Sequence, residues 1–554
     1  MCSSFKSTSL LMIFLFLLSL IFSSVQAQVP SNATFKFINQ DEFGDFIVEY
    51  NGNYRPLDVF NSPFQLCFYN TTPNAFTLAL RMATTRSESL FRWVWEANRG
   101  NPVGEGATLT FGTNGNLVLA EANGKVVWET NTTNKGVVGF KLLPNGNMVL
   151  HDSKGKFIWQ SFDFPTDTIL IGQSLLAKGQ KLVSRLSEKE NKNGPYSLIV
   201  KPKGISLYYK SKNSGKSLPY FTTAQKFSPV QGSLQNVTLK ASPTSDEGFA
   251  YDLSLELSTG GNFIVGRPKY NATLSFLRLG IDGNVKVYTY NDKVDWGAWE
   301  ESFSIFDRNS AWEDECHLPD RCGTFGICED NQCVGCPSEN GVLGWSKECG
   351  TKQVSSSCKP SDFHYYKVEG VDHFSSRYTN GDSVKESDCG NKCSLDCKCL
   401  GYFYNQQTFK CWIAYDLKTL IKVANSTHVG YIKTPNKQFS TGGSFIVRPK
   451  YNATLSFLRL EIDRNVKVYT YPEYKVDWDC GTKRVSSCKP SDFHYYKAEG
   501  VDHFSSRYSV KESDCGNKCS LDCKCLGYFY NQQTSKCGIA YDFKIGNKLA
   551  TLRT

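Results

Sequence analysis

Residues 107–130, ATLTFGTNGNLVLAEANGKVVWET, decide the fold class of this chain. Three short runs, TLTF, NLVLAE and KVVWET, alternate apolar with polar residues, and the segments GTNG and ANG separate them. Alternation with a period of two predicts strands with one buried face, and Asn-Gly dipeptides favour tight hairpin turns. The stretch therefore predicts three antiparallel strands joined by two hairpins.

The same plan returns directly downstream. Residues 140–160, FKLLPNGNMVLHDSKGKFIWQ, again alternate around Gly-containing turns, and Trp159 takes the position of Trp128. Helical signals are scarce along the chain. A repeated unit of strands and turns with an inward-facing tryptophan predicts a small β-barrel or β-prism built from subdomains. We therefore predict an all-β, multi-domain protein.

Residues 159–173, WQSFDFPTDTILIGQ, resemble the signature of plant bulb-type (mannose-binding-like) lectin domains. Such domains occur in S-locus glycoproteins, in their receptor kinases and in secreted epidermis-specific glycoproteins. The resemblance implies a β-prism-type bulb lectin domain over residues 28–180 and a second, diverged lectin-like domain over residues 181–310. Because a tight Pro-x-Asp turn after an aromatic strand would close the first domain, we expect the signature itself to be structural.

Two groups of cysteines follow the lectin-like region. The first resembles the EGF-like module of the same family, spans residues 311–349 and consists of Cys316, Cys322, Cys328, Cys333, Cys336 and Cys349. The second resembles a plant PAN/apple domain, spans residues 350–434 and consists of Cys358, Cys389, Cys393, Cys397, Cys399 and Cys411. The order lectin, lectin, EGF-like and PAN, without a kinase, is most similar to the secreted epidermis-specific branch of the family.

The end of the chain is a damaged second copy of what precedes it. Residues 258–296 return at 440–478, and the segment that begins at Glu348 returns from Asp479, but the block between them has no second copy. We predict a partial lectin-like repeat over residues 435–479 and a second, truncated PAN/apple repeat over residues 480–554. Its expected disulfide cysteines are Cys488, Cys515, Cys519, Cys523, Cys525 and Cys537. A tandem duplication that lost an exon and a fused gene model would both produce this arrangement, and we expect the function to reside in residues 28–434.

The N-terminus predicts secretion. Lys6 precedes an apolar run over residues 10–22, which is too short to span a bilayer, and a small-residue cleavage site ends at Ala27. We predict a signal peptide over residues 1–27, an extracellular location in the cell wall or apoplast, and no membrane span beyond the signal peptide. The N-x-S/T sequons that this route would expose to glycosylation are Asn32, Asn70, Asn131, Asn236, Asn271, Asn425 and Asn452.

The secretory route also decides the chemistry expected of the cysteines. In an oxidising compartment, clustered cysteines form disulfides, and these spacings lack the paired C-x2-C pattern of zinc sites. Cys67 and Cys480 are left over from the groups above. Three alternatives are open: both thiols are unpaired, they bridge each other, or they form an intermolecular disulfide.

Composition and motifs exclude several classes of function. The net charge of +9 is modest for 554 residues, and the lysines form no basic block, so we expect no nucleic-acid partner. A weak attraction to acidic polysaccharide is an open hypothesis. The chain has no G-x-S-x-G, H-E-x-x-H or P-loop motif, and His364 and His373 occupy strand-like segments. We therefore expect no enzymatic activity, no cofactor and no metal site.

Degraded sugar-binding frames run through the lectin-like region. Mannose-binding members of the resembling family carry QxDxNxVxY on one strand, where alternation directs the five side chains to one face. Three frames of this chain, residues 112–120, 143–151 and 280–288, retain part of that pattern. The retained residues are Asn114, Asn116, Val118, Asn145, Asn147, Val149, Asp282, Asn284 and Tyr288. Asn116, Asn147 and Asn284 each follow a glycine, where turn chemistry also favours asparagine. The lost Gln and Tyr positions predict weak or absent mannose binding.

Three hypotheses for the function follow. The first is a secreted, non-enzymatic glycoprotein that recognises glycans or glycoproteins, with mannose-type sugars suspected, in the cell wall or apoplast. The second is a soluble protein similar to a receptor ectodomain, which binds extracellular protein or peptide partners. The third is an inhibitor of a wall hydrolase, for which the sequence offers no reactive loop.

Overall fold

Antiparallel sheets make up most of the protein. The computed structural model describes residues 28–436 with gaps at 47, 84–90, 226–231, 244–250, 269–273, 292, 295–296, 348, 350–358 and 425–426. Beyond residue 436 it describes residues 456–460, 466–470, 495–498, 507–522, 525, 527–531, 534–540 and 550–553. The chain divides into two compact units, residues 1–438 and 439–554. The predicted signal peptide lies outside the described residues.

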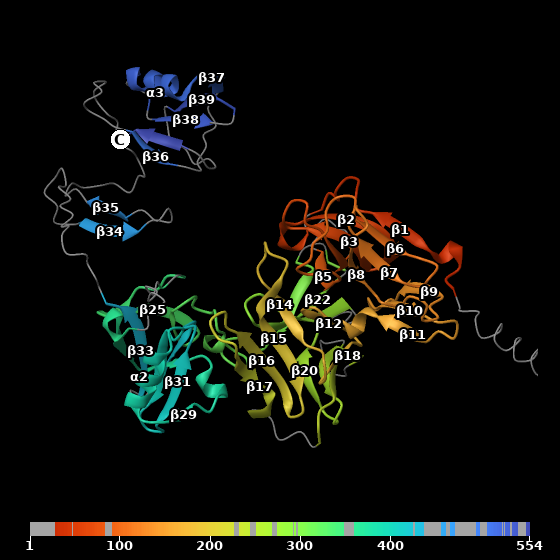
Figure 1. Ribbon diagram of the computed structural model, residues 1–554, viewed down its shortest axis with the longest axis horizontal. Helices are drawn as coiled ribbons and strands as arrows, with labels where there is room; N and C mark the ends of the chain where they lie inside the picture. Colours follow the sequence, from red (N-terminus) through yellow and green to blue (C-terminus); the bar gives the residue numbers. More distant parts are fainter. Residues whose placement is uncertain are drawn as a thin grey trace, which may run out of the picture. The chain divides into compact units, whose positions relative to one another are not determined.

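Three small sheets surround the first core, drawn red to orange in Figure 1. The first has the strand order β2-β3-β4-β5: Asn53–Asn61, Phe64–Asn70, Thr77–Met82 and Arg92–Glu96. The second has the order β1-β6-β7-β8: Phe35–Ile38, Thr108–Phe111, Leu117–Ala120 and Val126–Glu129. The third has the order β11-β10-β9: Phe157–Gln160, Met148–His151 and Gly139–Leu142. Both predicted hairpins of residues 107–130 form, as β6-β7 and β7-β8.

A tryptophan from each of the three sheets closes this core. Trp95, Trp128 and Trp159 contact one another edge to face, with ring centroids 5.8, 6.2 and 6.0 Å apart. Trp95 also donates its indole N–H to the carbonyl oxygen of Phe164 at 3.0 Å. Edge-to-face rings place the positive edge of one ring on the negative face of the next. The two predicted inward-facing tryptophans therefore join a third at the meeting point of the sheets.

A second set of three sheets repeats the plan around its own core. The first has the order β14-β15-β16-β17: Leu182–Arg185, Asn193–Lys201, Gly204–Lys210 and Ser217–Thr222. The second has the order β13-β18-β19-β20: Ser174–Leu176, Asn236–Pro243, Tyr251–Leu257 and Asn262–Gly266. The third has the order β12-β21-β22-β23: Thr168–Leu170, Ser275–Leu279, Val285–Tyr290 and Trp299–Ser304.

The third of these sheets lies between the two cores. Every residue of β21 is buried, Phe276 in the first core and Leu277 and Leu279 in the second. Strands β12 and β13 belong to the sheets of the second core although the predicted boundary placed them before residue 180. The chain crosses from one core to the other within the lectin signature itself, and the hydrophobic run after Thr168 can pair with either side when only sequence is considered.

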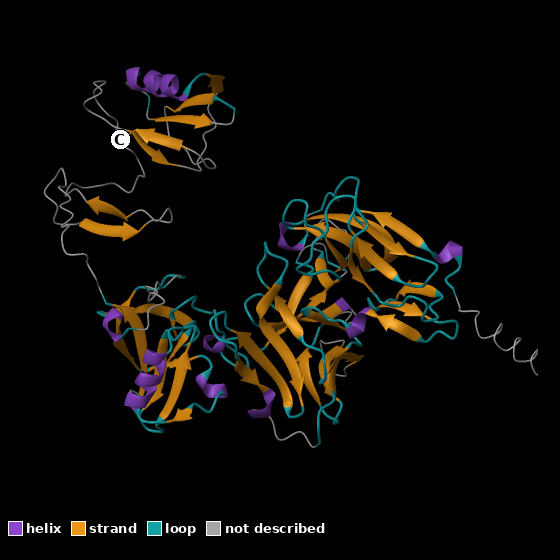
Figure 2. Cartoon of the chain, viewed as in Figure 1, coloured by secondary structure: helices purple, strands orange, loops and turns teal. Residues whose placement is uncertain are grey.

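The cysteine-rich region forms two five-stranded sheets. One has the order β26-β25-β24-β32-β28: Gly341–Leu343, Gln332–Ser338, Ile327–Glu329, Leu420–Lys422 and Val371–His373. The other has the order β27-β33-β30-β31-β29: Phe363–Glu369, His428–Pro435, Gly401–Asn405, Lys410–Ala414 and Asp382–Ser383. Helix α2 (Glu386–Leu395), purple in Figure 2, is disulfide-linked through Cys389 to Cys411 on β31. Because β24 pairs in parallel with β32, the predicted EGF-like and PAN/apple parts share a sheet.

The second unit rebuilds one of these sheets. Strands β34 (Ser456–Leu460) and β35 (Val466–Thr470) form a hairpin. A five-stranded sheet follows in the order β36-β40-β38-β39-β37: Tyr495–Ala498, Ala550–Arg553, Gly527–Asn531, Lys536–Ala540 and Arg507–Ser509. Helix α3 (Glu512–Leu521) has the same sequence as α2. The predicted fold class, all-β with bulb-lectin prisms and small disulfide-rich modules, is confirmed.

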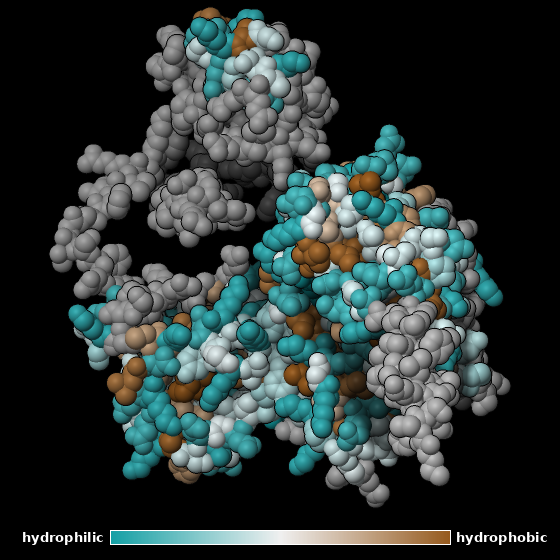
Figure 3. Space-filling view, turned by 45° about the vertical axis from the view of Figure 1, so that its right-hand side comes forward, coloured by the Kyte–Doolittle hydropathy of each residue, from teal (hydrophilic) through white to brown (hydrophobic). Residues whose placement is uncertain are grey.

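Most of the large apolar side chains that the structure describes lie in the cores, and few lie on the surface. On the face drawn in Figure 3, apolar residues form small separate patches within a mostly hydrophilic surface. Large apolar side chains such as Phe68, Phe76 and Phe221 are fully buried in the two prisms. Burial of apolar surface is the main favourable term in folding, at roughly 25 cal/mol per Å².

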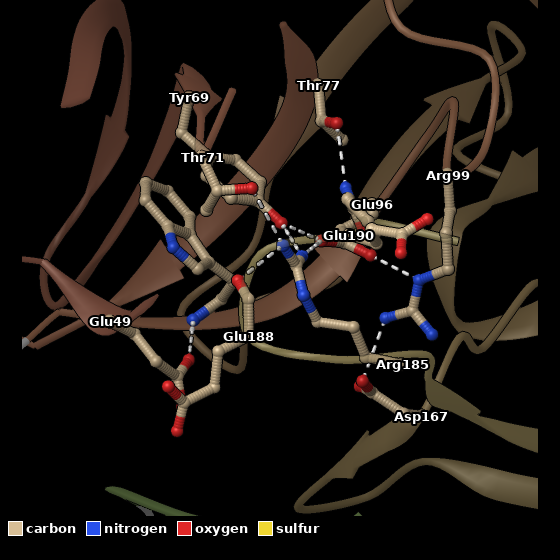
Figure 4. Close-up of polar contacts among 12 residues, drawn as sticks. Glu49, Tyr69, Thr71, Thr77, Glu96, Arg99, Asp167, Arg185, Glu188 and Glu190 are labelled. Atoms are coloured by element: carbon tan, nitrogen blue, oxygen red, sulfur yellow. Dashed lines mark hydrogen bonds and ion pairs between the residues drawn. The ribbon is translucent and has the colours of Figure 1, made fainter. Parts of the chain in front are cut away.

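A buried ionic network connects the two prisms (Figure 4). Arg185, whose side chain is 1% exposed, donates to the hydroxyl of Tyr69 at 2.6 Å and lies 3.6 Å from Glu96. Tyr69 in turn donates to Glu96. Arg99 donates to Glu96 and, at 2.8 Å, to Asp167. The network therefore joins strands β3 and β5 of the first prism to residues of the second.

Arg278 on β21 extends the connection. It contacts Glu49 at 2.5 Å, the carbonyl oxygen of Trp93 at 2.6 Å and the hydroxyl of Thr168 at 3.1 Å. Burial alone would raise the pKa of Asp167, but the positive charges of Arg99 and Arg278 hold that pKa below its usual value. A carboxyl group with a lowered pKa stabilises the fold above its unfolded pKa and loses that contribution in acid. Asp167 therefore stays charged at neutral pH.

We expect Arg185→Leu to lower the free energy of unfolding by about 3–5 kcal/mol, because it leaves Glu96 buried with one partner fewer. Urea unfolding followed by tryptophan fluorescence measures the change. Lys192→Leu is the control, since it removes an ion pair whose members are 61% and 56% exposed, and it should cost less than about 1 kcal/mol. Equal losses for both variants would show that the network does not hold the prisms.

Candidate carbohydrate-binding site

The three sugar-binding frames predicted from sequence lie at corresponding hairpins. Asn114 and Asn116 lie between β6 and β7, and the equivalent pairs occupy the β9-β10 and β21-β22 turns. In each pair the first side chain accepts the backbone N–H of the second. The oxygen-to-nitrogen distances are 3.1, 3.2 and 2.9 Å for Asn114, Asn145 and Asp282. The first residue of each pair therefore closes the turn.

Asn116, the second residue of the first pair, is buried and hydrogen-bonded to protein atoms. Asn116 is 3% exposed. Its Nδ2 donates to Glu129 at 2.7 Å, and its Oδ1 accepts from the hydroxyl of Thr130 at 2.9 Å and the backbone N–H of Thr132 at 3.0 Å. The side chain ties the hairpin to the residues that follow β8.

Asn147 and Asn284 repeat that role. Asn147 donates to Gln160 at 2.9 Å and accepts the backbone N–H of Phe162 at 3.3 Å. Asn284 donates to the carbonyl oxygen of Phe306 at 2.9 Å and accepts its backbone N–H at 3.1 Å. Both side chains are 3% exposed. The amide groups that would face a sugar thus bind protein atoms in all three frames.

The remaining frame residues differ in exposure. Val149 is fully buried, whereas Val118 and Tyr288 are half-buried. The ring of Tyr288 packs against Phe276 with centroids 5.4 Å apart. Because Asn116, Asn147 and Asn284 bind protein atoms, the geometry favours the turn role for these three asparagines. Binding at these nine residues stays a prediction.

The lectin signature is also used by the fold. Gln160, Ser161 and Phe162 supply the hydrogen bonds of Asn147. Gln173 accepts the backbone N–H of Leu170 and donates to the carbonyl oxygen of Phe162, both at 2.9 Å. Polar contacts therefore tie the signature to the β9-β10 turn of the third sheet and tie its two ends together.

One group of side chains has a metal-compatible spacing. Glu313, Asp314 and His317 place one possible ligand atom each within 4.8 Å of one another. Glu313 accepts from Tyr378 and Arg377, and Asp314 lies 3.1 Å from His317. Burial alone would raise the pKa of Asp314, but His317 lowers it below the usual value. These contacts account for the proximity of the three residues by ion pairing.

His373, noted in the sequence as an ordinary sheet residue, is buried. Its ring lies 2.8 Å from the hydroxyl of Ser375 and 2.9 Å from the carbonyl oxygen of Asp416. Burial lowers the pKa of His373 to about 4. The ring is therefore neutral at physiological pH and serves the packing of the sheet.

The structure provides the connectivity that the cysteine spacing left open. The disulfides of the EGF-like region are Cys316–Cys328, Cys322–Cys333 and Cys336–Cys349. Those of the two PAN/apple regions are Cys389–Cys411, Cys393–Cys399, Cys515–Cys537 and Cys519–Cys525. Cys397 is also disulfide-bonded. Cys358, Cys480, Cys488 and Cys523 lie outside the described residues.

Cys67 on β3 is a free, fully buried thiol. Burial raises its pKa to about 12, which keeps it protonated. The unpaired alternative therefore describes Cys67, and neither bridge proposed for it is formed.

The sequons differ in access. Asn32 and Asn131 are exposed and Asn236 is half-exposed, whereas Asn70 is 5% exposed. Asn271, Asn425 and Asn452 lie outside the described residues. Within the described part of the chain, no helix has the length and hydrophobicity needed to cross a membrane.

Comparison with known proteins places these features in context. Residues 92–188 match the family model described as D-mannose binding lectin. EP1-like glycoprotein 4 of Arabidopsis thaliana is 50% identical over 429 residues, which cover 76% of this chain and 96% of the relative. The epidermis-specific secreted glycoprotein EP1 of Daucus carota is 59% identical over 362 residues, 62% of this chain and 92% of the relative. These two relatives are named as glycoproteins, not as enzymes.

A more distant relative is a receptor kinase. The G-type lectin S-receptor-like serine/threonine-protein kinase SD2-5 of Arabidopsis thaliana is 26% identical over 384 residues. The match covers 68% of this chain and 44% of the kinase.

We expect Asn116→Ala to destabilise the protein by about 1–3 kcal/mol, because it leaves buried donors and acceptors around the hairpin without partners. The shift in the urea midpoint measures this. Asn123→Ala removes a comparable turn contact to Lys125, at 3.0 Å, on an exposed residue, and should change the stability by about 0.5 kcal/mol or less. Equal stabilities for the two variants would contradict the structural role.

We expect glycans on Asn32 and Asn131 and none on Asn70 of the secreted protein. A glycan attached to Asn70 has no room, since that side chain is buried in the first prism. Mass spectrometry of glycopeptides from the folded protein gives the occupancy of each sequon. A folded fraction that carries sugar on Asn70 would contradict the prediction.

Proposed function

The chain belongs to the family of EP1-like glycoproteins, and from this premise we propose that it is a secreted, non-enzymatic glycoprotein that binds glycans in the plant cell wall or apoplast. The observation that carries the proposal is the three-sheet prism in the region matched by the D-mannose binding lectin family. The relative from Daucus carota is named as secreted and epidermis-specific.

The disulfides support an extracellular location. The described residues contain disulfides in the EGF-like region and in both PAN/apple copies. Disulfides of this density persist in oxidising compartments and are rare in the cytosol. The predicted signal peptide supplies the route to such a compartment.

We further propose that simple mannose binding at the three frames is weak or lost. The side-chain amides of Asn116, Asn147 and Asn284 already donate hydrogen bonds to protein atoms. Each hydrogen bond to a sugar that is not made costs on the order of 1 kcal/mol, which is up to tenfold in affinity. Recognition of a longer glycan through other surfaces is compatible with this loss.

A second candidate function is binding of an extracellular protein or peptide. The observation that favours it is the exposure of Val342, Leu343 and Trp345 at the edge strand β26 and beside it, where they are 57%, 59% and 45% exposed. The similarity to the receptor kinase SD2-5 is consistent with such a role. Exposed apolar residues grouped on an edge strand are more typical of protein contacts than of sugar contacts.

A glycan array probed with the secreted full-length chain tests the proposal. We expect binding to oligosaccharides or polysaccharides of the cell wall, and a Kd for monomeric mannose weaker than about 1 mM, because Asn116, Asn147 and Asn284 bind protein atoms. A reduced and alkylated sample, in which the disulfide-linked modules unfold, controls for nonspecific adhesion. Silence across the array, together with capture of a defined apoplastic polypeptide, would favour the second candidate.

A further inference from the structure

A cavity of about 460 Å³ opens beside the tryptophans that close the first prism. Its walls come from β5, β8 and β11, from residues 163–166 within the lectin signature, and from residues 179–183 and Asn193 of the second prism. A volume between roughly 300 and 1,000 Å³ is usual for a site that takes a small ligand. None of the nine predicted frame residues lines this cavity, so it is separate from the strand sites.

Aromatic rings form one side of the cavity. Trp128 is half-buried, Trp159 is 7% exposed, and Phe164 stacks on Trp159 with centroids 5.8 Å apart and planes 15° from parallel. Phe164 is 56% exposed, which is unusual for a large ring held in an ordered contact. The apolar C–H face of a sugar ring is complementary to such a surface, because the face of an aromatic ring carries partial negative charge.

Polar groups without protein partners line the same cavity. The indole N–H groups of Trp128 and Trp159 have no acceptor among the residues that the structure describes, whereas that of Trp95 binds Phe164. Neither indole nitrogen is fully buried, so both can donate to a hydroxyl-bearing ligand that enters the cavity. The hydroxyl of Thr166 is buried and has no hydrogen-bond partner within the described chain, so a ligand in the cavity does not reach it.

The charges around the cavity disfavour an anionic ligand. Arg99 is paired with Glu96 and Asp167, whereas Glu129 accepts from the neutral amide of Asn116 at 2.7 Å. Asp163 and Lys181 are exposed and of opposite sign. The lining therefore carries one more carboxylate than cations, so it repels an anion while a neutral ligand meets no net repulsion.

We propose that this cavity, which we call the tryptophan pocket, binds a neutral saccharide unit of a glycan chain. The proposal rests on the glycan-binding function inferred above and assigns it to the closed end of the prism in place of the degraded strand frames. Stacking on Phe164 and Trp128 holds the sugar ring, and the indole N–H groups of Trp128 and Trp159 donate to its hydroxyl groups.

The sequon at Asn131 lies at this pocket, because Asn131 is exposed and is one of its lining residues. A glycan on Asn131 would compete with an external saccharide for the same space. Thr133→Ala abolishes the sequon and keeps the Asn131 side chain, so it provides the form of the protein to be tested.

Fluorescence titration of the secreted full-length Thr133→Ala protein with mannotriose and with cellotriose tests the proposal. We expect a saturable change in tryptophan emission with at least one of the two. Adding Phe164→Ala should weaken that binding at least tenfold, because it removes the ring on which the sugar stacks. Phe157→Ala is the matched control, since Phe157 is 44% exposed on β11 and does not line the pocket.

The titration and the glycan array together distinguish a failure of the pocket proposal from a failure of the glycan-binding proposal. No change in emission with either sugar, or equal affinities for the Phe164→Ala and Phe157→Ala proteins, would overturn the tryptophan pocket. If the array signal of the Thr133→Ala chain survives Phe164→Ala at full strength, glycan binding stands and lies elsewhere. A silent array with the Thr133→Ala chain removes the proposed function and the pocket together.

Discussion

The buried ionic network between the two prisms is the constraint on which the larger part of the structure depends. Arg185 and Arg278 bring their charges into the protein interior, and each is matched there by a carboxylate of the first prism. Desolvation makes an unpaired charge in such a place costly, so the observed docking of the two prisms is favoured over one that separates either arginine from its carboxylate. The network thus sets the orientation of the sheets, and with it the position of Trp159 and of the signature that follows.

Within each prism, a buried asparagine side chain holds neighbouring segments together through hydrogen bonds. A buried asparagine at the start of one strand binds backbone or side-chain groups that follow the next strand, in three separate hairpins. The same residues retain part of a sugar-binding pattern, which explains why sequence alone left two interpretations open. The difference between them is burial, which turn chemistry and spacing do not express. Once the hairpins close, the amide groups of Asn116, Asn147 and Asn284 bind protein atoms.

Sequence patterns predicted the features that depend on residues close together in the chain. Alternation and Asn-Gly turns identified the strands of residues 107–130, and the cysteine groups identified the disulfide-rich modules. Contacts between distant segments were beyond such patterns. The pairing of β12 with β21, the parallel pairing of β24 with β32 and the individual disulfides all depend on chain reversals that leave no periodic signal. The tryptophan pocket belongs to the same class, since it exists only where three sheets meet.

The duplicated tail shows how local and long-range contacts differ when a segment is copied. Its second PAN/apple copy closes through Cys515–Cys537 and Cys519–Cys525, bonds whose partners are 22 and 6 residues apart, so the copy carries its own constraints. The copied lectin segment is different. Strand β34 repeats the sequence of β21, which in the first unit is buried on both faces and ion-paired through Arg278 to Glu49. The repeat contains no counterpart of Glu49 or Asp167. The copied segment therefore repeats the strand without the sequence of the two prisms that bury it in the first unit, and the glycan recognition that we propose for the closed prism is attributed to the first unit.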